Sequence, residues 1–182
     1  MDIMREIESR RSVRKFQTRP VSEEAVRQII EAGRLAPSGN NSQPWRFLIV
    51  RDEETKKRIV AADSNQQWML DAPVFIVCMG DIRSRMAENV LKSVDEDTGL
   101  QDMRRIVRDM GIAVGYMLLE IEHMGLSTCW TGAYDQKAMR EAAGVPEYMY
   151  ISGVLPIGYG AEAPKARPRK DYDDIVRFER WE

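Results

Sequence analysis

Apolar positions along the chain follow two different spacings. After Ser22, which can cap a helix, they recur every three to four residues, and this spacing predicts a helix. Its inner face would carry Val26, Ile29, Ile30 and Gly33. The same spacing predicts a much longer helix over 101–124, whereas continuous apolar runs predict buried strands. We expect those strands at 46–51, 74–79 and 149–157, a strand edge at 126–131, and shorter helices at 2–9, 53–62 and 135–143.

This order of elements predicts an α+β domain in which a small central sheet is flanked by helices. Strands and helices alternate only in places, and the strands are too few for a doubly wound sheet. No repeat or linker interrupts the chain, so we treat 1–182 as a single domain. The charged stretch 81–99 is expected to be helical and mobile, and 161–182 to be an extended tail. The 101–124 helix could build a dimer, although plain core packing fits it equally well.

Composition narrows the class of protein. The 27 basic and 29 acidic residues give a net charge of −2, which disfavours a nucleic-acid binder. The longest apolar run, VFIVCM, is far shorter than the ~20 residues of a membrane helix. The start of the chain shows no secretory signal, and two cysteines without a CxxC pair suggest free thiols in a reducing compartment. We therefore expect a cytoplasmic protein with no membrane partner.

Histidine is almost missing from the chain. His123 is the only one, and it falls near the end of the long predicted helix. Catalytic triads and most zinc sites need histidine at the site, so we expect no metal centre and interpret His123 as a surface or boundary residue. If the protein is an enzyme, a bound cofactor is expected to supply the chemistry.

An arginine cluster stands out at the end of the first predicted helix. Arg10, Arg11 and Arg14 bracket Ser12 in the segment RRSVRKF. Guanidinium groups grip phosphate with paired hydrogen bonds, and a serine hydroxyl can add another. Taken alone, a solvated basic run explains the segment as well.

Two further segments could contact a ligand. The loop SGNNSQPW at 38–45 could offer backbone N–H groups and side-chain amides to the polar edge of a flat heterocycle, although an ordinary connection has the same composition. In the proline-rich tail, Arg167 and Arg169 are two residues apart, so both can point the same way and contact phosphate. The alternative is a basic tail that binds RNA or aids solubility.

Together these segments occur in an order that resembles the nitroreductase family of FMN-dependent flavoproteins. The matching segments are RRSVRKF (10–16), APSGNNSQPW (36–45), NQQWMLDAP (65–73), GLSTCWTG (125–132) and IGYGAEAPKARPRK (157–170). They span most of the chain. The resemblance implies an α+β fold that forms an interlocked homodimer with FMN at the subunit interface.

The resemblance also implies which residues contact FMN, and it names no catalytic side chain because the flavin carries the chemistry. Arg10, Arg11, Ser12 and Arg14 would bind the phosphate and the polar edge of the ring, with Arg167 and Arg169 helping at the phosphate. The partner subunit would contribute Ser38, Gly39 and Asn41 along the ring or ribityl chain. Asn65 would reach the pyrimidine edge, and Thr131 and Gly132 would lie beside N5.

The implied activity is hydride transfer from NADH or NADPH through flavin N5 to a nitro, quinone or similar small organic acceptor by a ping-pong mechanism. Three alternatives stay open: FMN storage or sensing without turnover, another flavin reaction on this fold such as reductive dehalogenation, and an RNA-interacting protein with a basic tail. The implied substrate lid at 81–99 contains no Trp, Tyr or Phe, which argues against large nitroaromatic substrates.

Overall fold

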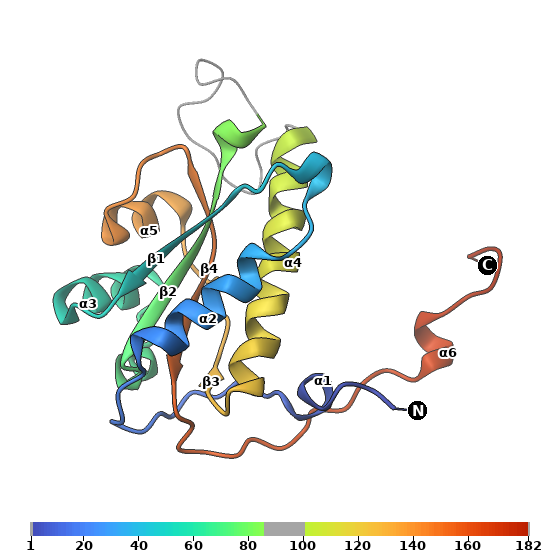
Figure 1. Ribbon diagram of the computed structural model, residues 1–182, viewed down its shortest axis with the longest axis horizontal. Coiled ribbons are helices and arrows are strands. Elements are labelled where there is room, and N and C mark those ends of the chain that lie inside the picture. Colours follow the sequence, from blue (N-terminus) through green and yellow to red (C-terminus); the bar gives the residue numbers. More distant parts are fainter. Residues whose placement is uncertain (1, 86–100, 182) are drawn as a thin grey trace.

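The computed structural model describes residues 2–85 and 101–181. Its helices are α1 (Arg5–Ser9), α2 (Glu23–Arg34), α3 (Glu53–Ala62), α4 (Gln101–His123), α5 (Gln136–Ala143) and α6 (Tyr172–Ile175). Its strands are β1 (Trp45–Val50), β2 (Val74–Asp81), β3 (Ser127–Thr128) and β4 (Met149–Gly158). Short 3-10 turns occupy η1 (Gly39–Asn41), η2 (Gln67–Asp71) and η3 (Ile82–Ser84). The sheet lies between α2 and α4 on one face and α3 and α5 on the other (Figure 1), which confirms the α+β prediction.

The sheet has the strand order β1-β2-β4-β3, and every neighbouring pair is antiparallel. Strand β2 is buried along its whole length. Ile76 and Cys78 belong to the core beneath α2 and α4, whereas Phe75 and Val77 belong to the core beneath α3 and α5. Because both of its faces are covered, this strand is a continuous apolar run in the sequence rather than an alternating one.

Local signals set the helix ends. At the start of α2, the Ser22 hydroxyl accepts a hydrogen bond from the Ala25 N–H (3.1 Å), as predicted. Asp52 caps α3 by accepting from the Thr55 N–H (2.8 Å). Helix α5 ends at Gly144, whose φ of 67° lies in the left-handed region that favours glycine.

The two sides of α4 differ. On its inner side α2 approaches so closely that a Cβ at Gly33 would lie 2.9 Å from Met117 Cγ. On its outer side, no described atom comes within 4 Å of a Cβ built at Gly111 or Gly115. Ile112 and Tyr116 are exposed, at 41% and 45% of their surface. The inner side of α4 therefore packs in the core, and Gly111 and Gly115 leave its outer side accessible to another chain segment.

Three predicted segments differ from the structure, and a fourth, 81–99, is described only in part. The strand edge expected at 126–131 is reduced to β3, and Thr131 adds only one bridge to β4. The first helix begins at Arg5 because Met4 has extended ψ (129°). Of the stretch 81–99, the first residues form η3 and 86–99 lie outside the described residues. The tail expected to be extended contains α6, a helix too short to leave a periodic pattern in the sequence.

Residues 12–17 join segments that are distant in the sequence. Ser12 pairs with Thr128, Phe16 pairs with Gly160, and the Ala161 N–H donates to the Lys15 carbonyl (2.8 Å). The chain near α1 and the chain after β4 therefore run side by side along one end of the molecule (Figure 1). Beyond this pairing the tail leads away from the sheet to α6 (Figure 1), with Tyr172, Ile175, Phe178 and Trp181 exposed.

Candidate functional site

A cavity of about 850 Å³ lies where α1, residues 10–14 and the C-terminal tail meet. Its basic side chains are Arg10, Arg11, Arg14, Lys165, Arg167 and Arg169, and its acidic ones are Glu8 and Glu162. Six cations against two carboxylates make it strongly electropositive, which favours an anionic ligand. The structure thus brings together both predicted arginine clusters and Ser12, although they are about 150 residues apart in the sequence.

The arginines of this cavity differ in what they already bind. Arg11 Nη1 donates to the carbonyls of Glu8, Ser9 and Arg10 at 2.7, 3.0 and 2.8 Å, so part of this side chain caps the end of α1. Within the described ranges, the side chains of Arg10, Arg167 and Arg169 form no hydrogen bond or ion pair. Three guanidinium groups are therefore available to a ligand without losing a protein partner.

Arg14 links the cavity to the loop after α3. Its N–H donates to Glu162 Oε1 (2.6 Å), and its guanidinium lies 5.7 Å from the centre of the Trp68 ring. Trp68 is half-buried against the core beneath α3 and α5, so it packs on the core and also contacts Arg14. This contact brings Arg14 to the segment that follows the predicted residue Asn65.

Asn65 and Gly132 lie on two loops that touch. The Ser64 hydroxyl donates to the Ala133 carbonyl (2.5 Å), and Asn65, which has a φ of 55°, is exposed to solvent. The Thr131 N–H already donates to the Val154 carbonyl (3.0 Å). By contrast, the Gly132 N–H is exposed and has no acceptor in the part of the chain that the structure describes. Gly132 is thus the better placed of the two to donate to a ligand.

The carboxylate of Asp63 lies under this turn. Asp63 is fully buried, and neither carboxylate oxygen has a hydrogen-bond partner in 2–85 or 101–181. A buried carboxylate of this kind is costly. It is adjacent to the turn that presents Asn65, but no contact in the structure gives it a chemical role.

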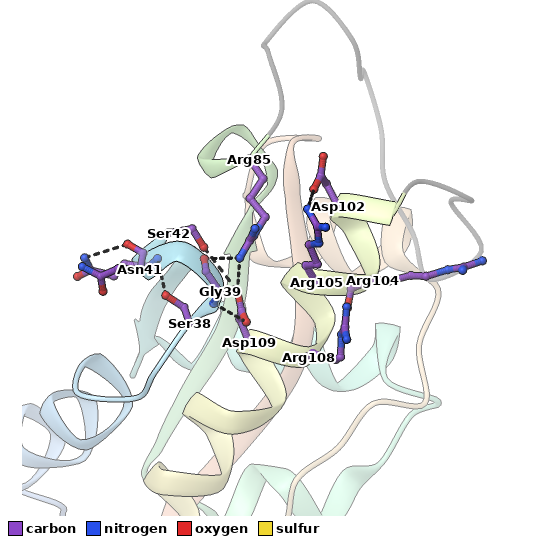
Figure 2. A network of polar contacts seen from close by, with 11 residues as sticks. Ser38, Gly39, Asn41, Ser42, Arg85, Asp102, Arg104, Arg105, Arg108 and Asp109 are labelled. Atoms are coloured by element: carbon purple, nitrogen blue, oxygen red, sulfur yellow. Dashed lines mark hydrogen bonds and ion pairs between the residues drawn. The ribbon is translucent and has the colours of Figure 1, made fainter.

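The remaining predicted residues, Ser38, Gly39 and Asn41, lie elsewhere. They sit beside the first turns of α4, at the opposite end of the molecule from α1 (Figure 1). There the Gly39 N–H donates to Asp109 Oδ1 (3.2 Å), and Arg85 donates both to the Gly39 carbonyl (2.5 Å) and to Asp109 Oδ2 (3.1 Å) (Figure 2). One chain therefore does not bring this loop to the arginine cavity.

The sequence interpretation did not predict the pairing of Arg85 with Asp109 that holds this loop. Their side chains are only 7% and 9% exposed. A signal for Asp109 was present, because it falls three residues after Ile106 and four before Ala113, on the buried stripe of α4. A charge at such a position needs a partner. Arg85 carried no comparable signal, since it lies in a charged stretch without periodicity.

His123 lies outside the site, as predicted. Its ring Nδ1 is 2.8 Å from Glu6 Oε1, so it joins the end of α4 to α1. The hydrogen bond and charge of Glu6 raise the pKa of His123, and the same contact lowers the pKa of Glu6. In the described ranges, no three His, Cys, Asp or Glu side chains gather as a metal site, and no helix there has the length and apolar character to cross a membrane.

Comparisons with known proteins agree on one family. The family model described as "Nitroreductase family" matches residues 7–159. A Methanothermobacter thermautotrophicus protein assigned as an NADH dehydrogenase or NAD(P)H nitroreductase is 32% identical, over 100% of this chain and 88% of its own length. The FMN reductase (NAD(P)H) of Bacillus subtilis is 31% identical, over 99% of this chain and 74% of its own length. A Desulfovibrio desulfuricans structure in complex with FMN aligns with a TM-score of 0.83 and 25% identity, over 98% of this chain and 97% of that one.

Proposed function

Because this chain belongs to the nitroreductase family, we propose that its arginine cavity binds the phosphate of FMN in an NAD(P)H oxidoreductase. The FMN-dependent activity follows from the family and from the FMN reductase relative. When bound, FMN supplies the redox chemistry by carrying electrons from NAD(P)H to a small organic acceptor in a ping-pong scheme. The observation that carries the phosphate assignment is the surplus of cations in one cavity.

The residues present fit a phosphate. Arg10, Arg167 and Arg169 form no ion pair within the described residues, so each can give a charge-assisted hydrogen bond to a phosphate oxygen. Ser12 adds a hydroxyl at the cavity wall. The volume of about 850 Å³ is within the range of cofactor sites and exceeds the needs of phosphate alone. Arg11 would mainly stabilise the end of α1 through its hydrogen bonds to the backbone, rather than contact the phosphate.

The ring of FMN would extend from this cavity toward the two touching loops. Asn65 would meet the pyrimidine edge, and the Gly132 N–H would donate to N5, because the Thr131 N–H is engaged with Val154. Thr131 would instead hold the loop against β4. Backbone and amide donors of this kind orient the ring without transferring a proton, so no catalytic side chain is assigned.

The complete site needs a second subunit, and we infer a homodimer. Ser38, Gly39 and Asn41 would reach the ring only from a partner chain, since their own chain holds them at the other end of the molecule. The open face of α4, with Gly111, Gly115 and their exposed neighbours, supports close approach by a second copy. The exposed aromatic residues of the tail could pack on that copy as well.

Cellular context follows from composition. The net charge of −2 supports a protein without a nucleic-acid partner, and the free thiols of Cys78 and Cys129 support a cytoplasmic location. The physiological acceptor would be a nitro compound, a quinone or a similar small molecule.

The test is the visible spectrum of the purified protein together with its mass in solution. We expect about one FMN per chain, twice the chain mass of 20.9 kDa, and oxidation of NAD(P)H with a quinone or nitrofuran acceptor. A colourless protein that takes up no added FMN would overturn the cofactor site. A loaded protein that turns over no acceptor would instead favour FMN storage or sensing. A monomeric mass for the active, loaded protein would overturn the shared site.

A further inference from the structure

A second basic cavity, of about 390 Å³, lies between the 39–40 loop and α4. Arg85, Arg105 and Arg108 line it, and Asp109 is its acidic residue. The segment 36–45, which carries the family resemblance, includes this loop, whereas none of the matching segments includes the three arginines. The cavity is separate from the one assigned to the FMN phosphate, since the two share no lining residue.

The charge of Asp109 is already used within the protein. Its carboxylate accepts from Arg85 Nη2 (3.1 Å) and from the Gly39 N–H (3.2 Å). The positive charges of Arg105 and Arg108 are therefore not cancelled from inside the cavity. Arg105 pairs with Asp102 (2.9 Å), but both side chains are about 40% exposed, so this pair is weak and can exchange for a stronger partner.

Arg108 is the least engaged of the three. Its Nε donates to the Arg104 carbonyl one turn earlier (3.2 Å), and it has no acidic partner in 2–85 or 101–181. Figure 2 shows that Arg104, the adjacent cation on the same helix, points away from the loop and the Arg85–Asp109 pair. Arg104 is exposed and does not line the cavity, which makes it a matched control.

The opposite wall of the cavity is held in a fixed shape. Asn40 and Asn41 have φ values of 54° and 53°, a backbone region that few non-glycine residues adopt. The contacts of Gly39 with Arg85 and Asp109 hold this loop on α4. A fixed wall facing the guanidinium groups of Arg108 and Arg105, the second held only by an exposed ion pair, is suited to bind a planar or tetrahedral anion.

We propose that this cavity binds a phosphate group of the nicotinamide dinucleotide donor through Arg108 and Arg105. The proposal rests on the proposed function, in which the 38–41 loop lies beside the flavin, so a donor that reaches the ring must pass this loop. Among the reactants only the donor is obligatorily anionic, since the nitro and quinone groups of the acceptors are themselves neutral. A volume of about 390 Å³ suits one phosphate-bearing part of the donor rather than the whole dinucleotide.

Two phosphates of the donor could occupy the cavity. The diphosphate is common to NADH and NADPH, whereas the 2′-phosphate belongs to NADPH alone. If the cavity binds the diphosphate, a variant should lose activity with both NADH and NADPH. If it binds the 2′-phosphate, the loss should be confined to NADPH, so one set of variants distinguishes the two.

The experiment compares Arg108→Gln and Arg105→Gln with Arg104→Gln in FMN-loaded protein. The kcat/KM for NADH and for NADPH is measured at low and at physiological ionic strength. Loss of one charge-assisted hydrogen bond should lower kcat/KM for the donor about tenfold, and less at high salt, with the acceptor's kcat/KM unchanged. Arg104→Gln removes the same charge from the same helix and should change kcat/KM less than about twofold.

A binding measurement independent of turnover completes the test. ADP-ribose carries the diphosphate but cannot reduce flavin, and its 2′-phosphorylated form adds the second phosphate. Calorimetric titration of both into loaded protein should show weaker binding in Arg108→Gln than in Arg104→Gln. Weakening for both probes assigns the diphosphate, and weakening for the phosphorylated probe alone assigns the 2′-phosphate.

Equal affinities and equal kcat/KM in all three variants would overturn the proposal. That outcome differs from failure of the proposed function, in which wild-type protein retains no FMN. In that case the same titrations on flavin-free protein still decide whether Arg108 binds the probes, because any binding in the arginine cavity is common to Arg108→Gln and Arg104→Gln and cancels in their comparison.

Discussion

Arg85 and Asp109 form an ion pair that is more than nine-tenths buried, with Nη2 3.1 Å from Oδ2. The pair also holds Gly39 from both sides, because Asp109 accepts its N–H and Arg85 donates to its carbonyl (Figure 2). An ion pair therefore fixes the loop that the proposed dimer presents to the flavin of the other subunit.

Replacing one member of this pair should be costly. Asp109→Asn leaves the guanidinium of Arg85 buried without a counter-charge, and we expect the free energy of unfolding to fall by about 3 kcal/mol. Urea denaturation of the flavin-free protein measures this change. Asp102→Asn is the control, since it breaks an exposed pair with Arg105 and should cost less than about 1 kcal/mol. Equal losses in the two variants would show that the buried Arg85–Asp109 pair contributes no more to stability than the exposed Arg105–Asp102 pair.

The arginine cavity predicts a specific loss of FMN. Arg10→Gln or Arg167→Gln should weaken FMN binding about tenfold or more, because each removes a charged donor that has no protein partner among the described residues. Quenching of flavin fluorescence on titration measures the Kd. Arg5→Gln removes the same charge from α1 outside the cavity lining and should leave the Kd within about twofold. If all three variants bind FMN alike, the phosphate lies elsewhere.

The close approach of α2 to α4 predicts overpacking. Gly33→Ala would bring a methyl group within 2.9 Å of the Met117 side chain, and we expect a loss of about 1–3 kcal/mol in unfolding free energy. Gly111→Ala is the matched change on the open side of α4, where helix propensity alone should add up to about 1 kcal/mol. Chemical denaturation at a concentration where both variants are monomeric compares them. A stabilising Gly33→Ala would mean that α2 and α4 can move apart freely.

The sole histidine gives a pH-dependent contact that can be followed directly. Glu6 raises the pKa of His123, so the contact stabilises the fold below the unfolded pKa of about 6.5 and is lost as pH rises through the folded pKa. The pKa of Glu6 is lowered by the same contact, so the stabilisation that its ionised carboxylate contributes is lost only as pH falls through that lower pKa. The ring resonances of His123, unambiguous in a chain with one histidine, should titrate above about 6.5 and return toward that value in Glu6→Gln. An identical pKa in both proteins would contradict the contact.

The fold was largely predictable because its main elements carry strong periodicity or continuous apolar runs. Helix α3 begins and ends where its pattern does, and β2 is recognisable from burial on both faces. The helix α6 and the short extent of β3 were not, since two to four residues carry no period and β3 depends on pairing with β4. Both arginine clusters were identified in sequence, but only the pairing of Phe16 with Gly160 explains why they meet.

The rest of the site depends on tertiary contacts. The family resemblance placed both Thr131 and Gly132 beside N5. The bond from the Thr131 N–H to Val154 shows that, of these two N–H groups, the one without an acceptor among the described residues is that of Gly132. The pairing of Arg85 with Asp109 spans 24 residues and a stretch without pattern, so no local rule could connect them.

The pairing of residues 12–17 with the chain after β4 has a consequence for the order of events in the cell. Arg14 and Glu162 are 148 residues apart, and the cavity is complete only when Arg169 is in place. A ribosome must therefore release almost the whole chain before the cavity can form, so the proposed FMN site would be loaded late, after translation. For the same reason, we expect a protease cut within the tail to open this cavity without removing any strand of the sheet.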